Sequence, residues 1–187
     1  MREGPKYYGI YRGTVLINVD PMQQGRIIAN VPDVSSVTPT TWINPCVPLT
    51  GLQSGTYMVP QMGAGVWIQF EAGDSDRPVY TGGWWGSAEE LPLAALIPPP
   101  PPAIGQNIVF QTGLKHLFMI SDGVPIPMMA PIPAPAPPGT GGIVLRSPTG
   151  AMIVVNDTGI YINNGKGATI EMVGPSIMIN KVALVVT

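Results

Sequence analysis

Residues that could carry out catalysis or hold a metal ion are few in this chain of 187 amino acids. It has one histidine, His116, and one cysteine, Cys46, so one chain cannot assemble a Cys/His metal cage, and a histidine-based triad would rest on His116 alone. Glu89 and Glu90 are adjacent, and on an extended chain adjacent side chains point apart, unlike the facing carboxylates of a glycosidase. We therefore predict no catalytic residue, no metal site, no cofactor and no enzymatic activity.

Two further features have structural explanations that are simpler than chemical ones. Cys46 lies in an apolar segment and is expected to be an inert core thiol. A group of glycines does not form a phosphate-binding loop, because no helix follows whose N-terminus could hold the anion. These glycines fit tight turns, and they are Gly63, Gly65, Gly82, Gly83 and Gly86.

The composition excludes several classes of protein. Gly and Pro each occur 23 times, against nine basic and eleven acidic residues. This density of Gly and Pro excludes a helical bundle, while the 45% of apolar residues is too high for a disordered chain. A net charge of −2 gives no basic surface for nucleic acid. The N-terminus has no apolar segment typical of a signal peptide, and the apolar run 91–104 is interrupted by the prolines at 98–102, so no membrane-spanning helix is expected.

The charges are concentrated in the first two thirds of the chain. The last 65 residues carry only five, which are Arg146, Asp157, Lys166, Glu171 and Lys181. A monomer with so few charges on a segment rich in Val, Ile and Met would expose apolar patches and strand edges, which favour association. The C-terminal part is therefore expected to associate with identical copies.

An internal repeat indicates the architecture of this C-terminal part. Residues 109–122 align with residues 144–157 at an offset of 35, and short alternating runs follow at 159–163, 168–173, 176–180 and 183–187. We expect about six rungs of a β-solenoid whose apolar row is buried in an intertwined homotrimer, with strand edges paired between chains. A single-chain β-sandwich is the alternative. The residues expected to point inward are Phe118, Ile120, Ile153, Val155, Ile160, Ile162, Ile170, Met172, Ile177, Ile179, Leu184 and Val186.

Prolines separate this part from the N-terminal region. From 92 to 138 they form two tracts, at 98–102 and 131–138, which are expected to be extended connectors. The expected domains are an N-terminal domain at 1–90, a Pro-rich linker at 91–107 and a β-helical segment at 108–187, with a Pro-rich insertion at 123–142.

The N-terminal region has the pattern of a small all-β barrel. Five strand-like runs, at 11–20, 25–32, 41–48, 65–73 and 78–85, are separated by Gly, Pro, Asp and Ser, as expected for an OB-type barrel. The adjacent Trp84 and Trp85 are expected to face opposite sides, one in the core and one toward another subunit or protein. An OB-fold can bind oligonucleotides or sugars, but the region contains few basic residues, so nucleic acid is not expected as a partner.

At these residues the sequence resembles a known family. The string YRGTVLINVDPMQQGRIIANVPDV, then WINPCVPL, then YMVPQMGAGVWIQFEAGDSDRPVYTGGWWG, resembles the OB-fold domain of phage baseplate assembly protein V over residues 9–86. Related domains occur in the spikes of bacterial type VI secretion systems and other contractile injection machines. SPTGAMIVVNDTG at 147–159 is similar to the T-x-S-G-x-x-I-x-x-D-D segments of the trimeric β-helical spike in that family.

The resemblance implies a structural role. The chain would be a homotrimeric central spike in a phage tail baseplate, which joins the hub or tail tube to the tip and pierces the target envelope. Its expected partners are a hub or tube protein at the OB end, through Trp84 or Trp85, a PAAR-like tip protein at the C-terminal end, and transiently the target membrane. The expected location is the virion or an assembled injection particle, after assembly in the host cytoplasm. The alternatives are a bacterial secretion or injection spike, an OB-fold ligand-binding protein, or an unrecognised secreted enzyme.

Overall fold

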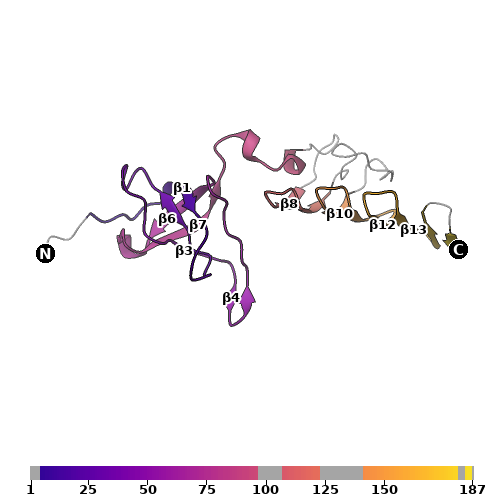
Figure 1. Ribbon diagram of the computed structural model, residues 1–187, viewed down its shortest axis with the longest axis horizontal. Coiled ribbons are helices and arrows are strands. Elements are labelled where there is room, and N and C mark those ends of the chain that lie inside the picture. The colour runs from indigo at the N-terminus through magenta and orange to yellow at the C-terminus, as the bar shows by residue number, and fades with distance from the viewer. Residues whose placement is uncertain (1–4, 97–106, 123–140, 181–183, 187) are drawn as a thin grey trace. The chain divides into compact units, whose positions relative to one another are not determined.

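The computed structural model describes residues 5–96, 107–122, 141–180 and 184–186. The chain divides into two compact units, Met1–Glu90 and Leu91–Thr187. Within the described residues the regular structure consists of β-strands and three short 3-10 helices (Figure 1). The predicted all-β fold class, with an OB-type domain at the N-terminal end, is confirmed. The two proline tracts expected as connectors lie outside the described residues.

The first unit is built on a curled five-stranded sheet. Its strand order is β2-β1-β6-β7-β3, with antiparallel neighbours except for the parallel β3–β7 pair. A separate two-stranded hairpin, β4–β5, projects away from this sheet (Figure 1). The elements are β1 (Tyr11–Ile17), β2 (Ile28–Asn30), β3 (Asn44–Pro45), β4 (Thr50–Gly51), β5 (Ser54–Gly55), β6 (Gly65–Phe70), η1 (Glu71–Gly73), β7 (Pro78–Trp84) and η2 (Ala88–Glu90).

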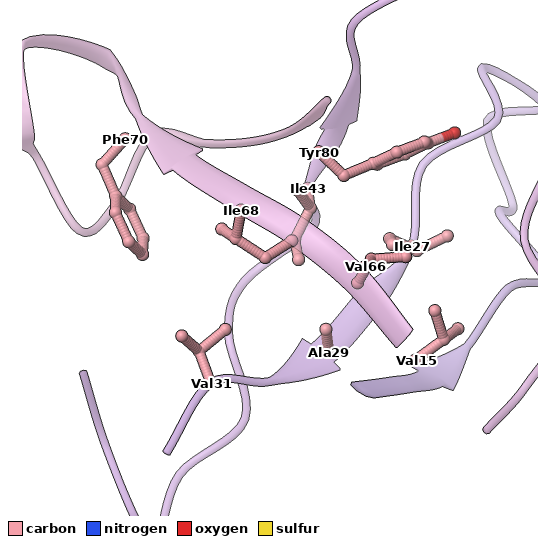
Figure 2. Packing of buried hydrophobic residues seen from close by; sticks show 9 residues of the cluster. All are labelled: Val15, Ile27, Ala29, Val31, Ile43, Val66, Ile68, Phe70 and Tyr80. Carbon is pink, nitrogen blue, oxygen red and sulfur yellow. The ribbon is translucent and has the colours of Figure 1, made fainter. Parts of the chain in front are cut away.

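Alternation along the strands forms the core of this unit. In β6 the buried residues are Val66, Ile68 and Phe70, which alternate along the strand and so lie on one face of the sheet. They converge with side chains from the other strands on one side of the sheet (Figure 2). The hydroxyl of Tyr80 donates a hydrogen bond to the carbonyl oxygen of Gly25 at 2.8 Å, and burial raises the pKa of Tyr80. The remaining members of the core are Val15, Ile27, Ala29, Val31 and Ile43.

A buried carboxylate holds the turn between β1 and β2. Asp20 accepts hydrogen bonds from the backbone N–H groups of Met22 and Gln24, at 2.9 and 2.8 Å. It also forms a two-point contact with the guanidinium of Arg26, whose shorter distance is 2.7 Å. The hydrogen bonds from Arg26 hold the pKa of Asp20 well below its usual range. Because Arg26 also lies over the ring of Trp42, this turn is fixed on two sides.

The structure corrects the prediction that Cys46 is a core residue. Its side chain is exposed rather than in the core. Ile43 is the buried residue of this segment, and the alternation that follows places Asn44 and Cys46 on the outer side. Cys46 is held in place through its backbone, since its N–H donates to the carbonyl oxygen of Tyr80 at 2.9 Å.

The second unit contains one eight-stranded antiparallel sheet. Its strands follow one another in chain order, so every connection joins neighbours. The short helix η3 lies within the segment expected as a linker, and its Ala94 packs with Leu117, Met119 and Val144 of the sheet. The elements are η3 (Leu93–Leu96), β8 (Asn107–Gln111), β9 (Leu117–Ser121), β10 (Gly142–Arg146), β11 (Met152–Asn156), β12 (Gly159–Asn163), β13 (Thr169–Val173), β14 (Ser176–Ile179) and β15 (Leu184–Val186).

The internal repeat corresponds to two hairpins of the same register. Val109 of β8 pairs with Met119 of β9, and 35 residues later Val144 of β10 pairs with Val154 of β11. The repeated segments therefore contain strands on both sides of their turns, which adds β8 and β10 to the strands expected from the sequence.

Strand pairing differs from the expectation. Each strand from β9 to β14 pairs on both sides within the same chain. The hydrogen bonds of these strands are thus satisfied internally rather than between copies, because an antiparallel meander pairs each strand with its sequence neighbours.

Candidate interaction surfaces

One face of the eight-stranded sheet carries two unbroken columns of apolar side chains. The register places one residue of each column on every strand, so each column crosses the whole sheet. We call this face the two-column face. The first column is Ile108, Ile120, Ile143, Val155, Ile160, Met172, Ile177 and Val186, and the second is Phe110, Phe118, Leu145, Ile153, Ile162, Ile170, Ile179 and Leu184.

Most of these side chains are exposed in the single chain. Ile153, Ile162 and Ile170, in the middle of the second column, are 40%, 36% and 38% exposed. Only β-branched and other apolar residues occupy the described positions, so the face has no polar group that would favour contact with water. A continuous apolar surface of this kind marks an interaction site in a soluble protein.

The opposite face of the sheet has a different character. Near its first strands it contains the buried residues Met119 and Val144, packed with Ala94 of η3. Farther along the sheet the residues on this face include Tyr161 and Glu171, which are opposite one another in the β12–β13 pair. Because polar residues and a short helix occupy this side, only the two-column face is apolar along its full length.

The twelve residues expected to point inward all have positions on the two-column face. Eleven of them have described side chains, and the twelfth, Val186, is placed by its backbone pairing with Ile177. The sequence reasoning missed four members, Ile108, Phe110, Ile143 and Leu145, which belong to β8 and β10. Their alternation with Val109 and Val144 was the signal that could have identified them.

Side-chain turns fix the ends of the strands. The Oδ1 of Asn156 accepts hydrogen bonds from the backbone N–H groups of Thr158 and Gly159, and the Oδ1 of Asn180 accepts one from the N–H of Thr169 at 3.0 Å. A Cβ at Gly159 would collide with the carbonyl oxygen of Met172. Asn156 therefore fixes the turn between β11 and β12, while Asn180 and Gly159 allow close contact between neighbouring strands.

A second surface feature lies on the outer side of the barrel sheet. The guanidinium carbon of Arg12 lies 5.6 Å from the ring centroid of Trp67 and 5.0 Å from that of Trp84. The two rings are 6.3 Å apart, and the Nε1–H of Trp84 donates to the carbonyl oxygen of Val66 at 3.2 Å. We call these three residues the Arg12 cluster. Gly65 makes the arrangement possible, since a Cβ there would lie 2.6 Å from the ring of Trp84.

Neither member of the expected tryptophan pair lies in the core. Trp84 is half-buried on the outer side, in the Arg12 cluster, because it pairs with Gly65 and its ring covers that glycine. Trp85 is 62% exposed. The part of the expectation that placed one of the two tryptophans in the barrel core is therefore wrong.

Each of the two units contains a region that matches a known protein family. Residues 11–85 match the type VI secretion system/phage-baseplate injector OB domain, and residues 134–185 match the phage baseplate V C-terminal trimerisation domain. The chain belongs to the phage baseplate assembly protein V family. A search of the curated proteins found no match. Members of these families are structural baseplate or spike proteins, and membership implies a place in the baseplate.

The family match gives the two-column face a context. The matched trimerisation domain contains β10 to β14 and supports a homotrimer. Together the two domains support a spike role in a phage baseplate or a secretion system.

The residues considered first for chemistry are dispersed in this baseplate protein. His116 is exposed in the β8–β9 turn, while Glu89 and Glu90 are exposed in η2, where Glu90 accepts a hydrogen bond from the N–H of Gly86. Within the described residues, no three His, Cys, Asp or Glu side chains are grouped as metal ligands would be. No helix among those residues is long and apolar enough to cross a membrane.

Proposed function

We propose that this protein is the homotrimeric central spike of a contractile injection apparatus of the phage-tail type. In the proposed trimer the two-column faces of three chains meet around one axis. The observation that carries the proposal is that both apolar columns run without interruption across all eight strands. The match to a trimerisation domain supports it.

The dimensions of the sheet suit such an assembly. Eight strands at about 4.8 Å spacing give a ribbon roughly 34 Å long, while each strand of about five residues spans only about 17 Å. One ribbon cannot bury its own apolar face, and three ribbons facing a common axis would enclose it. Burying the exposed part of one Ile or Leu side chain contributes roughly 1 kcal/mol, so the two columns of three chains together provide a large driving force for association.

The same arrangement explains how a thin rod could bear an axial load. The ladder hydrogen bonds of an antiparallel sheet run perpendicular to the strands and so would lie along the rod. Axial force would be carried by a continuous ladder within each chain, while the apolar axis prevents the three sheets from separating. The low number of charges after residue 122 would ease passage through lipid. Piercing of the target envelope is therefore a mechanical function that needs no substrate.

The proposal includes partners at both ends of the spike. The OB-type unit would attach to a hub or tail tube protein, and a PAAR-like protein would form the tip at the other end. The spike would contact the target membrane transiently during contraction and would bind no nucleic acid. A spike of a bacterial secretion or extracellular injection system is the second candidate, since the OB domain model covers both kinds of machine.

The mass of the full chain in solution tests the proposal. Sedimentation equilibrium at micromolar concentration should give three times the 19.7 kDa of one chain. A stable species of 19.7 kDa would contradict the proposal. For the hub attachment, co-expression with the tube and hub proteins encoded beside this chain should give a complex in which the trimer is retained.

A further inference from the structure

Among the described residues of the first unit, no carboxylate forms an ion pair with Arg12. The ion pairs there join Arg26 to Asp20 and Arg77 to Glu71. Arg12 is exposed, lies over two tryptophan rings, and has neither a hydrogen bond nor an ion pair among residues 5–96. Its N–H donors are therefore available in a fixed place, because the two rings restrict the guanidinium without using those donors.

The surroundings of Arg12 have the composition of a binding hot spot. Trp and Arg are the residues that most often dominate protein–protein interfaces. Beside Trp67 in the neighbouring strand is Gly82, where an added Cβ would meet no atom within 4 Å. The surface is therefore open next to the rings, which leaves room for a side chain of another molecule to approach the guanidinium.

Among residues 5–90, the first unit also contains carboxylates that form no ion pair with a described cation. The turn that follows η1 presents Asp74, whose Oδ1 accepts only the backbone N–H of Asp76, and the exposed Asp76. This turn is at the opposite end of the β6–β7 hairpin from the Arg12 cluster, since Phe70 pairs with Pro78 there and Gly65 pairs with Trp84 at the other end. One barrel therefore presents a cationic site and an anionic site toward opposite ends of the same hairpin, and the two form no ion pair within the described residues of one copy.

We propose that the Arg12 cluster binds the Asp74–Asp76 turn of a second copy within the trimer. Contacts of this head-to-tail kind, in which two different patches meet, close into a ring in a cyclic trimer. The proposal rests on the trimer of the proposed function, because the trimerisation domain holds three barrels at an effective concentration in the millimolar range, where weak pairs form. The planar guanidinium suits two-point binding of a carboxylate, and the tryptophan rings shield that contact from water.

Disulfide trapping in the full chain tests this contact directly. In a Cys46→Ser background, Thr14→Cys lies on the exposed side of β1 near the cluster, and Ser75→Cys lies in the acidic turn without removing a carboxylate. Mild oxidation should convert the chain with both cysteines into covalent trimers on a denaturing gel. The matched control combines Thr14→Cys with Ser36→Cys, which is exposed on another turn, and should remain uncoupled. Equal coupling in both, or in neither, overturns the proposal.

A charge swap provides an independent measurement. All four tryptophans lie before residue 86, so their fluorescence reports the unfolding of the barrel alone. Arg12→Glu should lower the thermal midpoint of the barrel by roughly 3 °C, as expected for a modest ion pair. Adding Asp76→Arg should restore at least half of this loss, whereas adding Asp33→Arg should restore none. If the swap restores nothing, Arg12 acts only within its own barrel and the inference is wrong.

The outcomes separate this inference from the proposed function. Every variant leaves the two-column face unchanged, so each should keep three times the 19.7 kDa mass of one chain. A wild-type monomer would overturn the proposed function, while an intact trimer without trapping or restoration would overturn only the barrel contact.

Discussion

A single lysine on the two-column face should separate the three chains. Ile170, the second residue of β13, is 38% exposed in one chain and is opposite Ile162 and Ile179 in the neighbouring strands. In the proposed trimer, Ile170→Lys would place three ammonium groups beside the same apolar axis. The adjacent Glu171 lies on the other face, so Glu171→Lys introduces the same side chain one residue away as a matched control.

The size of the effect follows from burial and charge. Each chain loses roughly 1 kcal/mol of apolar burial and adds an ammonium whose desolvation costs several kcal/mol if it stays buried. Summed over three chains, the free energy of association becomes less favourable by on the order of 10 kcal/mol. The loss is smaller to the extent that the long lysine side chains let their ammonium groups reach solvent. The ladder hydrogen bonds within each chain are unaffected, so the variant acts on association and not on strand pairing.

Sedimentation across a concentration series and tryptophan fluorescence measure the two consequences. Ile170→Lys should sediment as a monomer at concentrations where the wild type and Glu171→Lys are trimers. The barrel of the same variant should unfold near the wild-type temperature, because the tryptophans are all in the first unit. An Ile170→Lys trimer of unchanged stability, or equal dissociation of Glu171→Lys, would show that the two-column face is not buried between chains.

Three predictions concern the barrel. Asp20→Asn should lower the free energy of unfolding of the barrel by an amount that is constant between about pH 7 and pH 5 and that shrinks below about pH 4. The reason is that Asp20, whose pKa is lowered in the folded state, stabilises the fold only while its carboxylate is charged. Acid titrations followed by fluorescence would show this, and a pH-independent difference would contradict it. Gly65→Ala should destabilise the barrel by displacing Trp84, whereas Gly82→Ala, with open space around its Cβ, should be tolerated in thermal unfolding; equal effects would argue against the packing described. The exposed Cys46 should react with a thiol reagent in the native protein nearly as fast as in denaturant, and strong protection would show that another chain covers it.

Local alternation predicted much of the fold. The strand-like run at 65–73 contains β6, and in β11 to β14 the pattern of apolar residues identified residues that share one face. The same rule was incomplete at β8 and β10, where short apolar pairs were not recognised as strands, and it failed at Cys46, where an apolar neighbourhood did not determine which way the side chain points.

Composition and period-2 alternation were enough to predict a β protein with a barrel, a C-terminal repeat and a surface poor in charge, because these properties depend only on which residues occur and how they are spaced. The tertiary structure decided which residues from different strands stand opposite each other. It aligned two columns across eight strands and satisfied the strand hydrogen bonds within one chain. It also placed Arg12 over two tryptophan rings, one from β6 and one from β7. Such contacts depend on strand order and register, which involve residues far apart in the chain and therefore leave no local pattern in the sequence.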